Sequence, residues 1–167
     1  MDDRYADGSY LSGHPLWHAE RSEWKAAHVQ RGLEAAGVRP QRVVDVGCGA
    51  AAVLATVATS LGLAAAVGYD PSPDAPLDER AVGVVDRRMG GVADVEGEFD
   101  VALALDVFEH VDDYLGFINA CRPLAPVAVF HVPLEVYVAV VVLGRFGQSR
   151  EIHGHLHHFS RRTALDT

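Results

Sequence analysis

The chain has 167 residues, of which 49% are hydrophobic and 22% charged, and its formal net charge at pH 7 is −9. This length suits one domain with a sizeable core, and the composition excludes a largely disordered chain. The negative charge argues against a protein that grips a nucleic-acid backbone, because phosphate contacts need clustered lysines and arginines. We therefore expect a small molecule or another protein as the partner.

The N-terminal part predicts an arm followed by a helix. Residues 1–15 are rich in aspartate, glycine, serine and proline, which is typical of irregular structure. From Leu16 to Ala36 the pattern becomes helical, and Gly37 supplies a C-cap. We expect Trp17 and Trp24 to pack this helix onto the rest of the fold. The alternative is that Tyr5, Tyr10 and Trp17 form a lid over a ligand.

The remainder, residues 38–167, alternates short apolar runs with helical stretches. Runs that are apolar on both faces are typical of parallel strands covered by helices on both sides. Helices between successive strands predict an α/β fold with a doubly wound, mainly parallel sheet of about five strands. The expected strands are Arg42–Val46, Ala65–Tyr69, Val82–Val85, Phe99–Leu105 and Val127–His131, and the expected crossover helices are Ala51–Leu61 and Asp112–Cys121.

A glycine turn, Gly47-Cys48-Gly49, follows the first expected strand and precedes a helix. Glycines at such a turn let the backbone approach a ligand closely. The stretch matches G-x-G-x-x-A, so the glycines alone are compatible with a dinucleotide or with another nucleoside cofactor.

Two aspartates favour S-adenosylmethionine over a dinucleotide. Asp45 precedes the turn, where a carboxylate would lie near the negative pyrophosphate of a dinucleotide without benefit. S-adenosylmethionine instead brings an ammonium and a sulfonium, which are both positive. Asp70 ends the second expected strand and can accept hydrogen bonds from both ribose hydroxyls.

Three segments, VVDVGCGAAAVLATVA, VGYDPSP and FDVALALDVFEHVDD, together resemble class I S-adenosylmethionine-dependent methyltransferases of the group with an E-H-V motif. The resemblance covers about residues 38–133, and the later HLHHFS segment is also similar to one that many members carry. It implies a Rossmann-like fold, with S-adenosylmethionine as cofactor and S-adenosylhomocysteine as product. It also implies a cofactor site made of Asp45, Gly47, Cys48, Gly49, Asp70, Pro71, Asp86, Asp106 and Val107, with Asp86 as the acid that follows the third strand and meets adenine.

One departure concerns the turn itself. Members of this family usually have a third glycine around position 51, where this chain has Ala51, and a small polar residue near Ala50. Alanine is small enough to leave the turn intact, but a contributed hydroxyl is lost, which predicts weaker cofactor affinity.

Asp106, Glu109 and His110 follow the fourth expected strand at the sheet edge where doubly wound folds place ligands. Methyl transfer mainly needs orientation, and a general base helps only when the acceptor loses a proton. Imidazole titrates near neutral pH, so His110 and His155 are the candidate catalytic residues, with His131 as a further candidate. The structural alternatives are that Glu109 and His110 orient the next helix and that His131 is a buried histidine.

Four histidines between 153 and 158 raise the question of a metal site. No cysteine or E-x-x-H frame lies nearby, and patterns of histidine alone are weak evidence. We therefore expect no metal, and interpret the segment as part of an acceptor-side loop. The apolar stretch 136–143 is expected to form a helix over the acceptor pocket or to cover the edge of the fifth strand.

The chain stops at the start of a helix, whereas the resembled family normally continues into two further strands. The second region is therefore expected to be C-terminally incomplete, either as a truncated sequence or as a shortened protein. An uncovered fifth strand would be an open edge, which predicts a homodimer through that edge.

The sequence thus predicts an S-adenosylmethionine-dependent methyltransferase for a small-molecule acceptor, with oxygen preferred to carbon or nitrogen. The alternatives are a non-catalytic methyltransferase-like module that binds cofactor or dimerises, and an NAD-linked oxidoreductase. No tyrosine-lysine pair for hydride transfer is visible, and Lys25 is the single lysine. The acidic start, the eight-residue limit of apolar runs and the unpatterned cysteines predict a cytoplasmic protein with no membrane partner.

Overall fold

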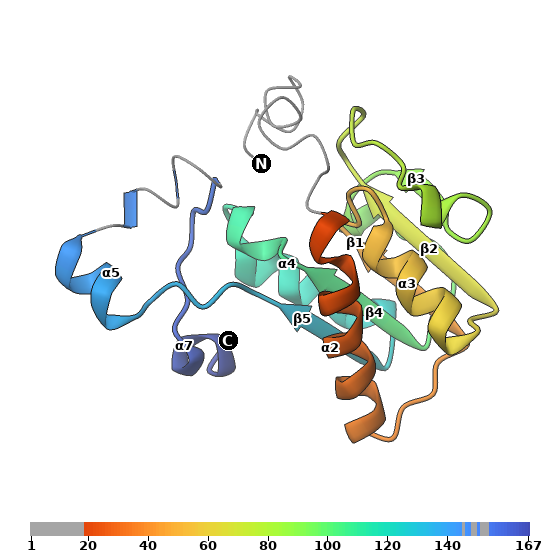
Figure 1. Cartoon of the computed structure of the whole chain (residues 1–167), viewed down its shortest axis with the longest axis horizontal. Coiled ribbons are helices and arrows are strands. Elements are labelled where there is room, and N and C mark those ends of the chain that lie inside the picture. Colours follow the sequence, from red (N-terminus) through yellow and green to blue (C-terminus); the bar gives the residue numbers. More distant parts are fainter. Residues whose placement is uncertain (1–18, 145, 148–149, 151–153) are drawn as a thin grey trace.

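A computed structural model describes residues 19–144, 146–147, 150 and 154–167. Its centre is one sheet in which all neighbouring strands run parallel, in the order β3-β2-β1-β4-β5 (Figure 1). This confirms the doubly wound α/β prediction. The strands are β1 (Arg42–Val46), β2 (Ala65–Asp70), β3 (Asp86–Met89), β4 (Val101–Leu105) and β5 (Val127–His131).

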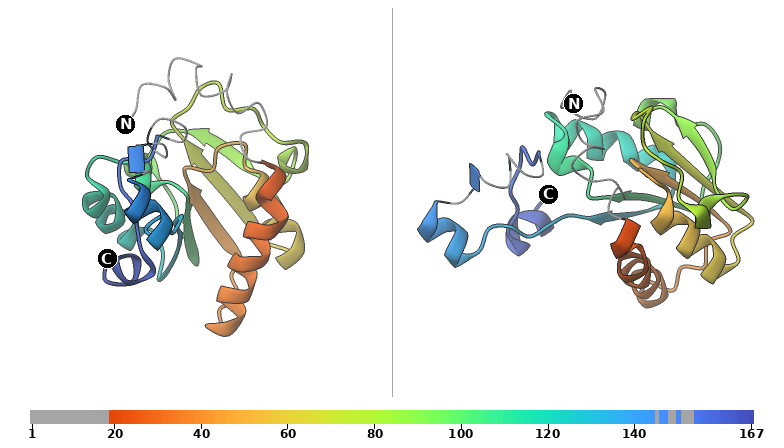
Figure 2. Two further views of the ribbon diagram at one scale, coloured as in Figure 1. Left: turned by 60° about the vertical axis from the view of Figure 1, so that its left-hand side comes forward. Right: turned by 45° about the horizontal axis from the view of Figure 1, so that its top comes forward.

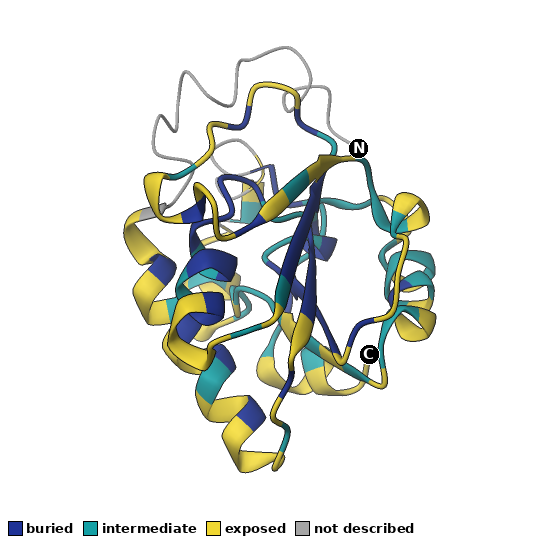
Figure 3. Cartoon of the chain, turned by 90° about the vertical axis from the view of Figure 1, so that its right-hand side faces the viewer, coloured by how far each residue is buried: buried dark blue, intermediate teal, exposed yellow. Residues whose placement is uncertain are grey.

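Helices cover both faces of the sheet (Figure 2). Helices α2 and α3 lie on one face, where Leu33, Leu54 and Leu103 belong to one buried cluster, and α4 lies on the other. Figure 3 shows the buried residues concentrated on the central strands and the inward sides of these helices. The helices are α2 (Ser22–Ala35), α3 (Ala52–Leu61), α4 (Tyr114–Cys121), α5 (Val138–Leu143) and α7 (Arg161–Leu165), and short 3-10 helices are η2 (Ala19–Arg21), η3 (Glu79–Ala81), η4 (Val92–Asp94), η5 (Phe108–His110) and η6 (Arg122–Leu124).

Helices η2 and α2 together confirm the predicted N-terminal helix from Ala19 onward. Gly37 follows α2 in the left-handed conformation that a C-cap requires. The buried side of α2 is formed by Ser22, Ala26, Val29 and Leu33. Trp24 is 55% exposed, so the prediction that it packs the helix onto the fold was wrong. Its ring instead lies against the rings of His28 and His131. Tyr5, Tyr10 and Trp17 lie outside the described residues.

The third strand is four residues later than predicted. Residues 82–85 form a turn, because Gly83 takes a φ of 73° and the Val84 and Val85 amides both donate to the Ala81 carbonyl. β3 begins at Asp86, which pairs with Val67 at the start of the parallel register. Asp86 thus lies at the amino end of β3 and not after its carboxyl end, so the prediction that it follows the third strand was wrong.

The segment between β1 and α3 forms a tight turn although it lacks the third glycine. Ala51 adopts φ 59° and ψ 15°, a left-handed conformation that costs a non-glycine residue roughly 1–2 kcal/mol. Its amide donates to the Cys48 carbonyl, and its own carbonyl accepts from Ala55 in the first turn of α3. The expectation that alanine leaves the turn intact is confirmed, with local strain as the consequence.

At the far side, β5 is the edge strand of the sheet within the described part of the chain. The apolar helix α5 lies away from the sheet in Figure 1, and Val138 and Val142 are 80% and 76% exposed. The expectation that this stretch covers the edge of β5 was therefore wrong. Among the described residues, no helix combines the length and apolar character needed to cross a membrane.

Candidate functional site

The glycine turn lies at the carboxyl end of β1, next to the loop that follows β4. Gly47 has a φ of 80°, and a Cβ added to it would lie 2.5 Å from Val107 Cγ2. Neither the conformation nor the space admits a side chain there. The Gly47 and Cys48 amides donate to the Tyr69 carbonyl at 2.7 and 3.1 Å, which fixes the turn against β2.

Asp70 ends β2 with its side chain turned to the same place. It is buried, its Oδ2 accepts from the Gly49 amide at 2.8 Å, and its Oδ1 accepts from the Ser72 amide at 2.8 Å. An ionised carboxylate has about four acceptor positions, so each oxygen has capacity for one more donor. Asp70 therefore both braces the turn and offers acceptor positions at its surface. Pro71 follows directly and is half-buried.

Asp45 lies within β1 and is 3% exposed. Its Oδ1 has no hydrogen-bond partner among the described residues. The pKa of Asp45 is raised to about 7, chiefly by burial and further by the Asp70 charge, against an opposing effect of Lys25. A buried carboxyl in this condition favours a cationic or hydrogen-bonding ligand, since either would replace the hydration it has lost.

Cys48 fills the space between the turn and β2. Burial raises the pKa of its thiol far above the ordinary value, and Asp45 and Asp70 raise it further. Such a thiol stays protonated and is a poor nucleophile. Cys48 thus acts as a packing residue of the turn.

Packing of Cys48 makes Gly68 intolerant of a side chain. A Cβ at Gly68 would lie 2.7 Å from Cys48 Sγ and 3.0 Å from Cys48 Cβ. We expect Gly68→Ala to lower the free energy of unfolding by roughly 1–3 kcal/mol, as overpacking does, and Cys48→Ala to restore part of it. Urea denaturation would measure both. The control is Gly32→Ala on the exposed side of α2, where the added methyl meets nothing within 4 Å and should stabilise the helix by roughly 0.5–1 kcal/mol. Equal losses at the two glycines would contradict this steric account.

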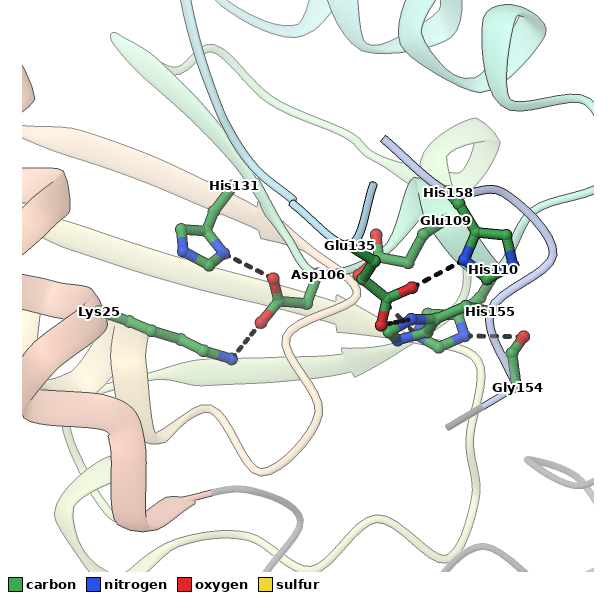
Figure 4. Close-up of polar contacts among 9 residues, drawn as sticks. All are labelled: Lys25, Asp106, Glu109, His110, His131, Glu135, Gly154, His155 and His158. Carbon is green, nitrogen blue, oxygen red and sulfur yellow. Dashed lines mark hydrogen bonds and ion pairs between the residues drawn. The ribbon is translucent and has the colours of Figure 1, made fainter. Parts of the chain in front are cut away.

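Asp106 follows β4 in the left-handed conformation, with a φ of 58°. Its Oδ1 accepts from His131 Nδ1 at 2.5 Å, and its Oδ2 lies 2.5 Å from Lys25 Nζ (Figure 4). Burial by itself would raise the pKa of Asp106, but the hydrogen bond from His131 and the charge of Lys25 outweigh burial and lower the pKa to about 2. Asp106 is thus an ionised centre between two donors.

Lys25 was missed by sequence reasoning as a site residue. It projects from α2 to the carboxyl edge of the sheet and influences Asp45 and Glu109 as well as Asp106. The available signal was that it is the single lysine of the chain, on a helix whose other charged residues are Glu23, Arg31 and Glu34.

Glu109, His110 and His155 come together beyond Asp106. Glu109 is fully buried, and neither carboxylate oxygen has a hydrogen-bond partner among the described residues. The rings of His110 and His155 lie with their centroids 4.9 Å apart, and His110 Nε2 is 3.9 Å from Glu109 Oε1. The two histidines predicted as catalytic are therefore neighbours, although they are far apart in sequence.

The other histidines have different surroundings. His131 belongs to the Asp106 network, His157 Nε2 lies 2.9 Å from the Val111 carbonyl, and His158 Nδ1 lies 2.8 Å from Glu135 Oε2. His153 lies outside the described residues. Among the described histidines of this segment, His155 thus turns toward Glu109, and His157 and His158 contact other groups.

The glycine turn, Asp45, Asp70, Asp106 and Val107 gather at or near the carboxyl edge of the sheet, whereas Asp86 begins the edge strand β3, level with Val67 in the middle of β2. The side chain of Asp86 is 57% exposed and pairs with Arg88. Asp86 therefore lies three residues before Met89, the β3 residue that pairs with Asp70. Ligands of open α/β sheets bind outside the carboxyl ends of the strands, which is where the remaining residues lie.

Comparison with known proteins finds sequence relatives of one kind. A ubiquinone biosynthesis O-methyltransferase from Azotobacter vinelandii is 32% identical over 124 residues, which cover 65% of this chain and 52% of that protein. Another, from Methylocella silvestris, is 37% identical over 91 residues, which cover 50% of this chain and 35% of that protein. The chain spans about half the length, or less, of these relatives.

Solved structures share the fold. Magnesium protoporphyrin IX methyltransferase from Synechocystis PCC 6803, with bound S-adenosylhomocysteine, superposes with a TM-score of 0.59 at 20% identity, covering 90% of this chain and 70% of that chain. The methyltransferase domain of bacterial CtHen1 superposes with a TM-score of 0.61 at 14% identity, covering 89% of this chain and 81% of that chain. Both confirm the Rossmann-like architecture.

A family model described as a methyltransferase domain matches residues 16–165. Such a family implies S-adenosylmethionine as the methyl donor, in agreement with the sequence prediction. Because the match covers most of the chain, the protein belongs to this family of methyltransferase domains.

Proposed function

We propose that this chain binds S-adenosylmethionine at the carboxyl edge of its sheet and transfers the methyl group to an oxygen of a small molecule. The observation that carries the proposal is the convergence of two buried carboxyl groups, Asp45 and Asp70, on the Gly47–Gly49 turn. Asp70 suits the ribose of either cofactor class, but a dinucleotide pyrophosphate would lie near the Asp45 carboxyl without benefit, whereas the positive groups of S-adenosylmethionine would be attracted to it.

Each acid has a distinct proposed role. Asp70 binds the ribose hydroxyls with the acceptor positions that the Gly49 and Ser72 amides leave open. Asp45 attracts the positive methionine portion, directly or through water, because its Oδ1 has no partner in the described part of the chain. Gly47 and Val107 lie against each other and form the floor of the site.

When bound, the cofactor supplies a methyl group already activated by the sulfonium. The Gly47–Gly49 turn, Asp45 and Asp70 would hold the cofactor, which would offer this methyl group to an acceptor oxygen and leave as the neutral thioether. The chain contributes orientation, and a base that removes the acceptor proton. His110 and His155 remain the proposed bases, and His131 is a further candidate, because Asp106 holds its Nδ1 and Nε2 could accept the proton.

Oxygen is proposed as the acceptor atom because the curated relatives are named O-methyltransferases. Since the chain covers only part of those proteins, we do not assign their substrate to it. We further propose that residues 1–37 act as arm and packing helix beside the cofactor domain of residues 38–167, that the protein is cytoplasmic, and that the β5 edge supports a homodimer.

Calorimetric titration separates the cofactor classes. We expect binding of S-adenosylmethionine and S-adenosylhomocysteine and none of NAD. Binding of NAD alone would overturn the proposal. Cofactor binding without methyl incorporation into any member of a hydroxylated metabolite panel would favour the non-catalytic alternative.

Asp70→Ala tests the ribose contact. We expect it to weaken S-adenosylmethionine binding by roughly 1.5–3 kcal/mol, the scale of hydrogen bonds to a charged group. Asp86→Ala is the matched control, because this aspartate is exposed on the edge strand β3 and paired with Arg88, and its loss should change affinity by less than about 0.5 kcal/mol. An unchanged affinity in Asp70→Ala would show that the ribose is held elsewhere.

A further inference from the structure

We propose that Glu109, His110 and His155 form a binding site for a divalent transition-metal ion. One ligand atom from each of the three residues lies within 4.8 Å of the others (Figure 4). The three come from two segments, η5 after β4 and the stretch before α7. This proximity is the first of three observations that support the site.

The second observation is the state of Glu109. The residue is fully buried, and both carboxylate oxygens lack a hydrogen-bond partner within the described residues. Buried carboxylates in proteins are normally hydrogen-bonded, ion-paired or coordinated to a metal, because an unsatisfied one is costly. The side chain points toward His110, whose Nε2 is 3.9 Å from Oε1. A cation between them would satisfy the carboxylate.

The third observation is the orientation of the two imidazoles. His110 Nδ1 lies 3.3 Å from the Gly154 carbonyl, which can only accept, so Nδ1 carries the proton. His155 Nδ1 lies at an ion-pair distance of 2.9 Å from Glu135 Oε1, but the contact does not have hydrogen-bond geometry. The Gly154 contact thus places the lone pair of His110 on Nε2, and the Glu135 carboxylate lies beside Nδ1 of His155. Metal-ligating histidines typically donate their other ring nitrogen to a carbonyl or carboxylate in this way.

The supporting residues are themselves fixed. Glu135 is held by His158, whose Nδ1 lies 2.8 Å from Oε2. The Leu156 and His157 amides both donate to the Glu109 carbonyl, at 2.8 and 3.2 Å. The backbone that presents His155 is therefore bonded directly to the residue that supplies the carboxylate, which preorganises the three ligands.

Two imidazoles and one carboxylate select a first-row transition ion such as Zn²⁺ or Mn²⁺ over Mg²⁺ and Ca²⁺, which prefer oxygen ligands. Three protein ligands leave coordination positions open, as in catalytic zinc sites. This site lies next to Asp106 in sequence and adjoins the cofactor edge. With a metal on Nε2, neither histidine could act as a base. If the proposed function holds, the ion would take over that role, because an acceptor hydroxyl bound at an open position would have its pKa lowered and would lose its proton more readily.

This proposal replaces the sequence expectation of no metal. That expectation rested on the histidine-rich segment taken alone, in which no suitable partner is near in sequence. The missing ligand is Glu109, which the fold brings to His155.

Titration calorimetry of the chelator-treated chain with Zn²⁺, Mn²⁺ and Mg²⁺ tests the site. We expect one equivalent of Zn²⁺ or Mn²⁺ to bind, with Mg²⁺ much weaker. Glu109→Gln and His155→Ala should each weaken binding at least about 10-fold, and Glu135→Gln, which alters the carboxylate that contacts His155 and His158, by about 10-fold. His28→Ala, which removes an exposed histidine of α2, is the control and should bind as the unmodified chain does.

Co²⁺ substitution gives a readout that does not depend on activity or on folding alone. We expect visible absorption bands from cobalt bound to nitrogen and oxygen ligands, lost in His155→Ala and kept in His28→Ala. Circular dichroism confirms that each variant is folded. Absence of metal binding, or binding unaffected by Glu109→Gln and His155→Ala, would overturn the proposal. Cofactor titration on the same samples keeps the two proposals apart, since failure to bind S-adenosylmethionine with metal binding intact would count only against the proposed function.

Discussion

Replacing Asp45 by asparagine should stabilise the unliganded protein at pH 8 and weaken its binding of S-adenosylmethionine. Burial raises the pKa of Asp45 from 3.8 to about 7 in the folded state. Each pKa unit corresponds to about 1.4 kcal/mol, so ionisation of this group opposes folding by roughly 4 kcal/mol at most. Asparagine has nearly the same shape and never ionises.

The pH dependence has a definite sign. Asp45 has a higher pKa in the folded state than in the unfolded state. Such a carboxyl does not oppose folding at pH values below its pKa in the unfolded state, and it destabilises the fold progressively as the pH rises to its pKa in the folded state. The stability difference between Asp45→Asn and the unmodified chain should therefore be near zero at pH 4, grow between pH 4 and pH 7, and level off above. Urea denaturation at several pH values measures it.

Asp100→Asn provides the opposite sign. Asp100 accepts from the Gln41 and Arg42 amides, which lower its pKa. Its substitution should destabilise the protein at neutral pH and matter less in acid. If Asp45→Asn proves destabilising at pH 8, or if its effect does not change with pH, ionisation of the buried Asp45 carboxyl does not oppose folding. Unchanged affinity for S-adenosylmethionine would remove Asp45 from the proposed site.

The local sequence pattern was sufficient to predict the strands and the turn that form the carboxyl edge of the sheet, where the cofactor is proposed to bind. Short apolar runs identified β1, β2, β4 and β5. The first three are largely buried, and β5 alternates partly buried with exposed residues. The Gly47–Gly49 turn and Asp70 could be placed because both lie at a strand end, and parallel strands bring their carboxyl ends to one edge. Strand-end position is a local property that sequence expresses directly.

β3 could not be found this way. Its residues, DRRM, are mostly exposed because β3 is an edge strand, whereas the apolar run before it is broken by Gly83. An apolar run in the sequence indicates that a segment is buried, and not that it is a strand. An exposed edge strand therefore gives only a weak sequence signal for a strand. The misplacement of Asp86 followed from this.

Long-range partners were the other limit. Trp24 was assigned to the core because aromatic residues usually are, yet the buried stripe of α2 consists of small and aliphatic side chains. Nothing near Glu109 in sequence indicates that His155 will lie beside it, or that Lys25 will meet Asp106. Such pairings depend on how elements pack, and no local period encodes them.

Lys25→Met should destabilise the protein at neutral pH by roughly 1–3 kcal/mol, the scale of breaking a partly buried ion pair. Lys25 Nζ lies 2.5 Å from Asp106 Oδ2, with side chains 14% and 27% exposed, and its charge also lowers the pKa values of Asp45 and Glu109. Without it, three neighbouring carboxyl groups lose their shared cation.

The pH profile of Lys25→Met should differ in direction from that of Asp45→Asn. Asp106 has a pKa of about 2 in the folded state, below its value in the unfolded state. Such a carboxyl stabilises the fold at pH values above its pKa in the unfolded state, and this stabilisation is lost as the pH falls through its pKa in the folded state. The deficit of Lys25→Met should therefore be full above pH 4 and shrink as pH approaches 2. Lys25→Arg keeps the charge and should retain most of the stability, so equal losses in both variants would show that packing of the lysine stem, and not its charge, holds α2 to the carboxyl edge of the sheet.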